Sequence, residues 1–370
     1  MPESAPDARV RLIIATGSGR SGTSTVAGTL KRLGLHVPQP EMPADESNPR
    51  GFYEPQWVVE FHKRLLNSIP ARTNDARPRA AEQIREAAAA PEVREELTTW
   101  LSEQVAEVGP GGQLAIKDPR TFWVNELWSD VADELDIDLS YLTMLRHPAQ
   151  VVQSRETHYL TNQTDEFRRT RQTANLAGWV NAAYETEVAT RPRPRAFVRY
   201  ADLLADWRGA MIQAAAQTGI TYNADLTSTD HHPVDDFIDV KLNRAQITWD
   251  EVDTIPELQE QAIASWDACD VLVDSPYDEG AIATLAEMHE RYVVLHQYAE
   301  AIALDHTNVS VAQERRAVQA KLKAAHAEAT ADLKDRLNRR KRQVAKLEQQ
   351  LSQAGGADTA PTRSRLPWKR

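Results

Sequence analysis

The chain of 370 residues contains one cysteine, Cys269, and no apolar run long enough to span a bilayer. A single cysteine excludes a disulfide within the chain and zinc sites built from several cysteines. A transmembrane helix needs about 20 apolar residues, and the first ten residues lack the basic and apolar blocks of a secretory signal peptide. These absences predict a cytoplasmic protein in a reducing compartment.

The composition is that of a folded soluble protein, with 41% hydrophobic and 26% charged residues. The net charge of -11 argues against nucleic acid binding over the whole surface. The charge is uneven, however, because residues 314–370 carry 15 Lys and Arg against six Asp and Glu. We therefore expect an acidic body followed by a cationic C-terminal segment.

Predicted strands and helices alternate along the first two thirds of the chain. The strands are expected at residues 9–16, 113–120, 139–148 and 195–200, and the helices at 23–35, 55–67, 80–108, 121–135, 149–158, 166–190 and 200–218. Alternation of this kind predicts an α/β fold with a parallel sheet flanked by helices, which binds ligands at the carboxyl ends of its strands. Residues 221–280 look irregular, because Pro233, Pro256 and Pro276 interrupt them.

The sequence from about residue 280 has helical spacing. Its later part has a short coiled-coil-like seam formed by Leu333, Leu337, Val344, Leu347 and Leu351. Arg340 interrupts this seam, which favours a projecting helix over a long independent coiled coil. We expect a main domain over residues 1–305, a basic helical extension over 306–353 and a disordered tail over 354–370. The extension could form a homo-oligomer, bind an acidic partner or lie on an anionic membrane surface.

A glycine-rich loop lies between the first predicted strand and the helix that follows. Its residues are Gly17, Ser18, Gly19, Arg20, Ser21, Gly22, Thr23 and Ser24. Backbone N–H groups and the helix dipole favour an anion at such a position. The loop nearly matches GxxxxGK[ST], but Thr23 stands where the lysine that reaches the β and γ phosphates would be. It therefore suits a 5′-phosphate better than a triphosphate to be cleaved, and the alternative is a plain chain-reversing turn.

Two motifs make the sequence resemble the sulfotransferase superfamily over roughly residues 10–205. The [KR]-S-G-[TS] phosphate loop is represented by residues 20–23, and an Arg and a Ser eight residues apart by Arg146 and Ser154. The resemblance implies a P-loop NTPase-like sulfotransferase fold and the donor 3′-phosphoadenosine 5′-phosphosulfate (PAPS). It implies that Gly19, Arg20, Ser21, Gly22, Thr23 and Ser24 bind the donor's 5′ end. Arg146 and Ser154 would then hold its 3′-phosphate, with Lys241 and Arg244 as further candidates.

The resemblance also implies catalytic residues. Lys117 stands where relatives keep a lysine near the transferred group, and Arg20 supplies a second cation from the loop. The histidine base of many cytosolic relatives is absent, because Asp118 and Pro119 follow Lys117. Residues 48–55 resemble a loop of bacterial sulfotransferases whose carboxylate is Glu54 here, so Glu54 is the expected base. Glu54 could instead stabilise the start of the next helix, and Asp118 could be either a substitute base or a turn residue.

These features predict a sulfotransferase of the bacterial carbohydrate or glycolipid type, which moves a sulfuryl group from PAPS to an acceptor hydroxyl. The alternatives are a P-loop nucleotide-dependent kinase and a coiled-coil interaction protein. We expect no metal, because His231 and His232 lie among aspartates without a recognised ligand spacing. Five aromatic residues could stack on sugars or belong to the core: Phe52, Tyr53, Trp57, Trp123 and Trp128.

Overall fold

The computed structural model describes residues 9–46, 48–160, 162–239 and 247–354. Internal contacts divide the chain into two units, Met1–Gln297 and Tyr298–Arg370. The division falls a few residues before the boundary expected at residue 305. Among the described residues, no helix has both the length and the apolar character required to cross a membrane.

Four parallel strands form a single sheet in the order β2-β1-β3-β4. They are β1 (Arg11–Thr16), β2 (Gln113–Lys117), β3 (Asp138–Leu145) and β4 (Arg195–Arg199). Ala15 of β1 pairs with Lys117 of β2, and Thr16 pairs with Thr143 of β3. The four predicted strands and the predicted α/β class are confirmed, and the carboxyl ends of the strands share one edge of the sheet.

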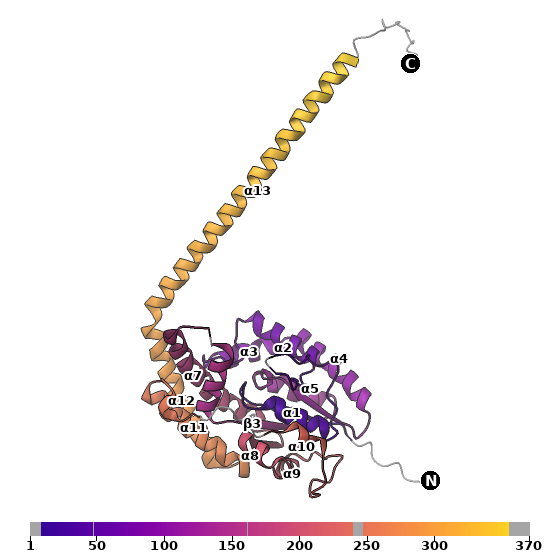
Figure 1. Ribbon diagram of the computed structural model, residues 1–370, viewed down its shortest axis with the longest axis vertical. Helices are drawn as coiled ribbons and strands as arrows, with labels where there is room; N and C mark the ends of the chain where they lie inside the picture. Colours follow the sequence, from indigo (N-terminus) through magenta and orange to yellow (C-terminus); the bar gives the residue numbers. More distant parts are fainter. Residues whose placement is uncertain (1–8, 47, 161, 240–246, 355–370) are drawn as a thin grey trace, which may run out of the picture. The chain divides into compact units, whose positions relative to one another are not determined.

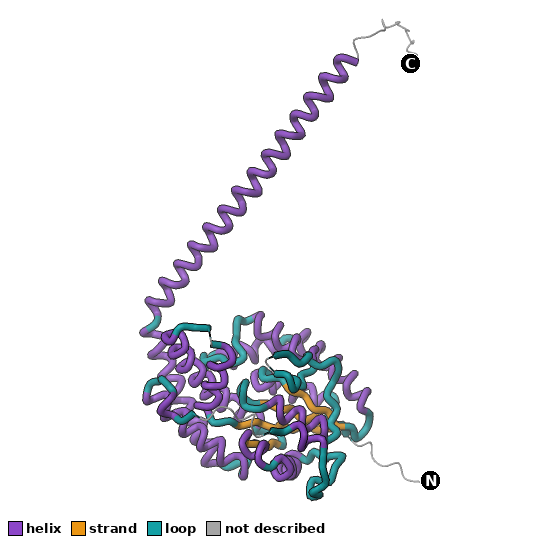
Figure 2. The backbone as a smooth tube through the Cα atoms, in the orientation of Figure 1, coloured by secondary structure: helices purple, strands orange, loops and turns teal. Residues whose placement is uncertain are grey.

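Helices cover both faces of this sheet, which explains why its strands are almost wholly apolar (Figure 2). Leu12 and Ile14 of β1 face one core, and the alternate residues Ile13 and Ala15 face the other. The first core is closed by α2 (Gln56–Ser68), α3 (Ala80–Ala88), α4 (Pro91–Val108), η1 (Thr121–Val124) and α5 (Asn125–Glu134). The second is closed by α1 (Thr23–Arg32), α8 (Tyr200–Ala205), α9 (Trp207–Thr218) and α10 (Pro233–Phe237).

Further helices pack beside β3 and β4. They are α6 (Pro148–Tyr159), α7 (Asp165–Thr190), the 3-10 helix η3 (Trp249–Glu251), α11 (Pro256–Asp274) and α12 (Glu279–Ile302). Val152 of α6, Trp179 of α7 and Leu258 of α11 share one core cluster, which Tyr292 of α12 completes. The first turns of α6, which follow Arg146, are therefore packed against α7, α11 and α12.

Several predicted element boundaries are wrong, for local reasons. Residues 80–108 form two helices, because Pro91 opens a new helix at its first position. Residues 200–218 divide at Asp206, whose side chain accepts a hydrogen bond from the Gly209 N–H (3.0 Å) and so starts α9. Residues 221–280 are not irregular throughout, because Pro256 opens the 19-residue helix α11 instead of interrupting it.

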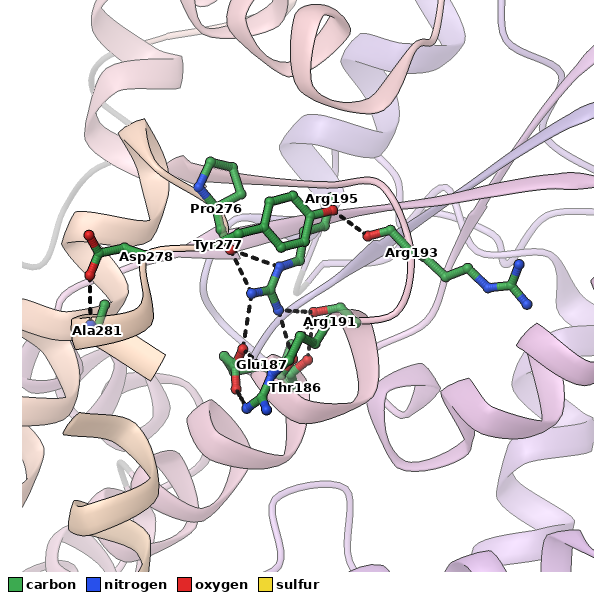
Figure 3. Close-up of polar contacts among 10 residues, drawn as sticks. Thr186, Glu187, Arg191, Arg193, Arg195, Pro276, Tyr277, Asp278 and Ala281 are labelled. Carbon is green, nitrogen blue, oxygen red and sulfur yellow. Dashed lines mark hydrogen bonds and ion pairs between the residues drawn. The ribbon is translucent and has the colours of Figure 1, made fainter. Parts of the chain in front are cut away.

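A buried ion pair fixes the start of β4 (Figure 3). The fully buried Arg195 side chain donates from Nη2 to Glu187 Oε1 (3.0 Å) and from Nη1 to the Glu187 carbonyl (2.8 Å). It also donates from Nε to the carbonyl of Pro276 (2.9 Å). One guanidinium therefore ties β4 to the end of α7 and to the segment between α11 and α12.

The second unit is dominated by α13 (Leu304–Ala354), a helix of 51 residues. Figure 1 draws it as one continuous helix, and none of its residues is buried. The residues of the predicted seam lie on this helix and are exposed. The tail expected from residue 354 falls almost wholly outside the described residues, which end at 354.

Candidate active site

The strand order reverses between β1 and β3. The chain passes from β1 to β2 on one side and then crosses to β3 on the other side of β1. In open parallel sheets, ligands bind where the strand order reverses in this way. Residues 17–22 follow β1, and Arg146 follows β3. The two sequence motifs therefore meet at the one position of the sheet that topology favours for a ligand.

The loop after β1 has a backbone conformation with positive φ angles, which glycine adopts more easily than other residues. Gly17, Arg20 and Gly22 have positive φ angles of 130°, 79° and 96°. A Cβ atom on Gly22 would lie 2.2 Å from the ring of Tyr200. The Ser21 hydroxyl donates to the carbonyl of Ser18 (2.6 Å), which closes the turn. Glycine at position 22 is therefore required by both the backbone angle and the close approach of the tyrosine.

The start of α1 is available to an anion. Its N-cap residue is Gly22, and in the described structure no side chain caps it and no acidic residue lies in its first turn. The amide groups at the N-terminus of a helix lack carbonyl partners within the helix and carry partial positive charge. Thr23 and Ser24 occupy this first turn. The predicted phosphate-binding loop thus has the geometry of an anion site.

Arg20, Arg146 and Ser154 come together beside this loop. Arg20 Nε donates to Ser154 Oγ at 3.2 Å, and Arg146 Nη1 donates to the carbonyl of Arg20 at 3.1 Å. The Arg146 guanidinium lies 5.0 Å from the centre of the Tyr200 ring. Burial lowers the pKa of Arg146, Tyr200 opposes this effect, and the charge of Arg20 adds to it. Two guanidinium groups therefore lie close together beside the start of α1.

A second cluster joins β2 to the start of α1. Lys117, the last residue of β2, forms a buried ion pair with Oε1 of Glu54. Its Nζ also donates to Ser24 Oγ at 3.2 Å. The exposed fractions are 3% for Lys117 and 7% for Glu54. The predicted lysine, the predicted carboxylate and the last loop residue therefore form one connected group.

Glu54 is a buried carboxylate whose pKa is raised by its surroundings. Burial raises its pKa, the positive charge of Lys117 opposes the rise, and the negative charge of Asp118 adds to it. The helix that follows, α2, begins at Gln56 with Pro55 as its N-cap residue and no side-chain cap. Glu54 therefore makes no capping hydrogen bond to α2, while its position just before Pro55 leaves an interaction with the helix dipole open.

Asp118 is a turn residue. Its side chain is completely buried, and Oδ1 accepts from the Arg120 N–H while Oδ2 accepts from Arg120 Nη1, both at 2.6 Å. Burial alone would raise its pKa, but the contacts with His62 and Arg120 outweigh burial and lower it. An enclosed carboxylate with a lowered pKa is poorly suited to take a proton from an acceptor.

Three residues that the sequence analysis did not identify support the site. Asn48 Nδ2 donates to Ser24 Oγ (3.3 Å), and Arg155 Nη2 donates to the carbonyl of Gly19 (3.4 Å). The buried His62 accepts from Trp128 Nε1 at its Nε2 (3.1 Å), with its Nδ1 at 3.5 Å from Asp118 Oδ1. Arg155 directly follows Ser154 and Asn48 opens the segment 48–55, so both lie beside a sequence signal, whereas His62 has none.

Four of the five aromatic candidates are packed against other side chains. Trp123 and Trp128 are buried, Tyr53 packs on Phe237, and Trp57 stacks on Trp100 with ring centres 4.5 Å apart. Lys241 and Arg244 lie outside the described residues. Within the described ranges, no group of three or more His, Cys, Asp or Glu side chains is placed to hold a metal ion.

The chain is similar to solved sulfotransferase domains, although no curated protein matches it. Two of these structures are the sulfotransferase domain from the Synechococcus PCC 7002 olefin synthase and that from the curacin biosynthetic pathway. The first has 16% identity and a TM-score of 0.39 and covers 72% of this chain and 98% of its own. The second has 14% identity and a TM-score of 0.37 and covers 70% and 98%.

The model of the sulfotransferase family matches residues 13–224, a segment that runs from β1 to beyond α9 and contains both motifs and the Lys117–Glu54 pair. This match spans more than half of the 370 residues. The chain therefore belongs to the sulfotransferase family.

Proposed function

We propose that this sulfotransferase takes its sulfuryl group from PAPS and transfers it to a hydroxyl of a carbohydrate or glycolipid. The observation that carries the proposal is the convergence of Arg20, Arg146 and Ser154 beside the uncapped start of α1. Two anionic groups on one ligand would match these two neighbouring features. PAPS carries a 3′-phosphate and a 5′-phosphosulfate and supplies the sulfuryl group.

In this proposal the two ends of the donor have separate partners. The amides of residues 19–24 and the dipole of α1 bind the 5′ end. Arg146 binds the 3′-phosphate through its guanidinium, and the Ser154 hydroxyl adds a neutral donor. The donor would displace Ser154 as the partner of Arg20 Nε. The Arg20 guanidinium could then donate to the phosphate oxygens of the donor, in addition to that of Arg146.

The second cluster supplies the groups that act during transfer. Lys117, held by Glu54 and Ser24, places a positive charge at the end of β2, where it stabilises negative charge on the oxygens of the transferred group. Glu54 accepts the proton of the attacking hydroxyl. Its raised pKa suits this role, because a base is most effective when its pKa approaches the working pH.

The acceptor class rests on Glu54. In the superfamily, a glutamate at this point of the sequence is typical of branches that act on carbohydrates, and here this carboxylate is buried against Lys117. The tryptophans that could have formed a stacking platform for sugars belong to the core. Recognition of the acceptor would therefore rest on polar contacts more than on aromatic stacking.

The test measures transfer of radioactive sulfate from the donor to an acceptor. The purified chain is incubated with [³⁵S]PAPS and separate pools of carbohydrates, glycolipids and hydroxylated lipids without sugars, and products are separated by chromatography. The proposal predicts a labelled product in a sugar-containing pool, and its loss with Glu54→Gln. Label only in the sugar-free pool would overturn the acceptor class. Absence of transfer in every pool, with phosphorylation from [γ-³²P]ATP instead, would overturn the donor.

A further inference from the structure

The helix α13 carries large apolar side chains along one side although none of its residues is buried. Eight of them have exposed fractions between 44% and 72%: Leu304, Val311, Val318, Leu322, Leu333, Leu337, Val344 and Leu351. At about 100° per residue, all eight fall within a sector of about 100° of the helix surface. We call these eight residues the α13 stripe.

Half of the α13 stripe follows an eleven-residue spacing, over Val311, Leu322, Leu333 and Val344, and Val318 and Leu351 are 33 residues apart. Leu304 and Leu337 each lie seven residues before another member of the stripe. An eleven-residue repeat keeps a stripe nearly straight along an α-helix, whereas a seven-residue repeat drifts around it. The apolar side therefore faces one direction over about 70 Å, at 1.5 Å per residue.

The α13 stripe is also symmetric about the midpoint between Ala327 and Glu328. The residues equally far from this midpoint are Leu304 with Leu351, Val311 with Val344, Val318 with Leu337, and Leu322 with Leu333. Arg315 and Arg340, which interrupt the stripe, are equally far from it as well. The one large apolar residue of this sector outside the pattern is Leu347, whose counterpart is Asn308.

We propose that α13 binds a second copy of this chain as an antiparallel helix pair, with the two-fold axis between residues 327 and 328. An antiparallel pair places each residue opposite the one equally far from the axis, so the symmetry of the α13 stripe sets each of its eight large apolar residues against another large apolar residue. A parallel pair places each residue opposite itself and needs no such symmetry. The symmetry therefore distinguishes the two arrangements.

The dimensions of the stripe fit a helix partner. The eight side chains of the stripe are each about half exposed or more. If a partner covers them and the small residues beside them, each chain buries on the order of 800 Å², the area of a standard interface. A stripe about 100° wide is typical of a helix that packs against protein, whereas a membrane-surface helix has a wider apolar face with aromatic residues. α13 has no Phe, Trp or Tyr.

Charge also favours the antiparallel arrangement. Residues 334–346 contain seven Lys and Arg and one Asp. A parallel pair would place this cationic segment against its own copy, whereas the antiparallel pair places it against residues 309–321, which contain three Lys and Arg and one Glu. Repulsion is reduced but not removed, and Arg315 faces Arg340 across the pair. The dimer should therefore strengthen as salt screens these charges.

The first test is the mass of the full-length protein by sedimentation at about 10 μM. The proposal predicts twice the chain mass of 41.5 kDa. Leu322→Asp with Leu333→Asp should weaken the dimer at least 100-fold and leave monomer. The control is Ala324→Asp with Ala331→Asp, which adds the same charges about 200° around the helix from each leucine and should leave the dimer intact. A wild-type monomer, or equal behaviour of the two variants, would overturn the proposal.

The second test reports orientation. Leu322→Cys and Leu333→Cys are made in separate full-length proteins, in which the native Cys269 is buried. Under mild oxidation, the antiparallel pair predicts a disulfide-linked dimer when the two variants are mixed and little when either is alone. Self-linking of each variant alone would show a parallel pair and overturn the proposal.

A charge exchange gives an independent readout. Arg340→Glu places a carboxylate opposite Arg315 in the antiparallel pair and should tighten the dimer at least tenfold at low salt. In a parallel pair, the introduced carboxylate would face its own copy, and the affinity would not improve. Binding of a monomeric wild-type protein to vesicles of anionic phospholipid, without self-association, would assign α13 to membranes instead.

Discussion

At the residue scale, Glu54, Lys117 and Ser24 show what a local pattern can and cannot predict. Each is identifiable separately, from a loop, a strand end and a phosphate motif. Their connection required the fold, because β2 pairs with β1 and so brings Lys117 beside the start of α1. Asn48 and His62 were missed for the same reason, since each contacts partners far away in the sequence.

Replacing Glu54 by Gln should lower kcat by about 10² to 10⁴, because the amide retains the shape of the side chain but cannot accept a proton. The affinity for 3′-phosphoadenosine 5′-phosphate should change by less than about twofold, since Glu54 contacts Lys117 and not the phosphate loop. The matched control is Glu60→Gln, an exposed glutamate of α2. An equal loss of kcat in both variants would rule out the proposed base.

The rate should also depend on pH through Glu54. The base acts when deprotonated, so kcat/KM, which reports groups of the free enzyme, rises with pH through the pKa of Glu54 and levels off above it. Burial raises that pKa above the ordinary value of a glutamate, against the opposing charge of Lys117. The acidic limb of the profile should therefore lie above the pH range of an exposed glutamate. It should vanish from the residual activity of Glu54→Gln, and its persistence there would assign it to another group.

At the element scale, prolines explain most differences between the predicted and observed boundaries. Pro91, Pro233 and Pro256 each open a helix at its first position, where the missing N–H is not needed. A proline that interrupts a helix and one that begins it look alike in a single sequence. The strands were predictable because both faces of the sheet are buried, which makes each strand a short apolar run.

The loop before α1 should not tolerate a side chain at position 22. Gly22→Ala combines a φ of 96° with a Cβ atom 2.2 Å from the Tyr200 ring. Gly219→Ala, with φ 76° and ψ 5° in the same left-handed region as Gly22 and nothing within 4 Å, isolates the backbone cost. Urea unfolding should show a loss of free energy of unfolding about 2 kcal/mol larger for Gly22→Ala. Equal losses would mean that Tyr200 moves aside without cost.

The buried pair in Figure 3 should be sensitive to the loss of one partner. Glu187→Gln leaves the enclosed Arg195 charge without its carboxylate and should lower the free energy of unfolding by about 3–5 kcal/mol. The double variant Glu187→Leu with Arg195→Met removes both charges and should lose less free energy of unfolding than Glu187→Gln. Urea unfolding measures both, and a double variant less stable than Glu187→Gln would contradict this account.

At the scale of the whole molecule, one arrangement explains why two short motifs far apart in sequence were informative. The strand order β2-β1-β3-β4 makes β1 and β3 neighbours, so the segments after them meet at the point where the order reverses. The sequence motifs predicted that Arg20 and Arg146 would bind opposite ends of one ligand. The sequence could not show that Arg146 donates a hydrogen bond to the Arg20 carbonyl or that Arg20 donates to Ser154, because these contacts depend on the fold.

The central claim is that this meeting point binds a nucleotide with a 3′-phosphate. Isothermal titration calorimetry with 3′-phosphoadenosine 5′-phosphate tests it most directly, on the wild type, Arg146→Ala and the surface control Arg94→Ala, whose arginine pairs with Asp130 and Glu134. The account predicts binding by the wild type and the control, and at least a 100-fold loss with Arg146→Ala. Equal affinity of all three proteins, or binding of ATP with the 3′-phosphorylated nucleotide ignored, would contradict it.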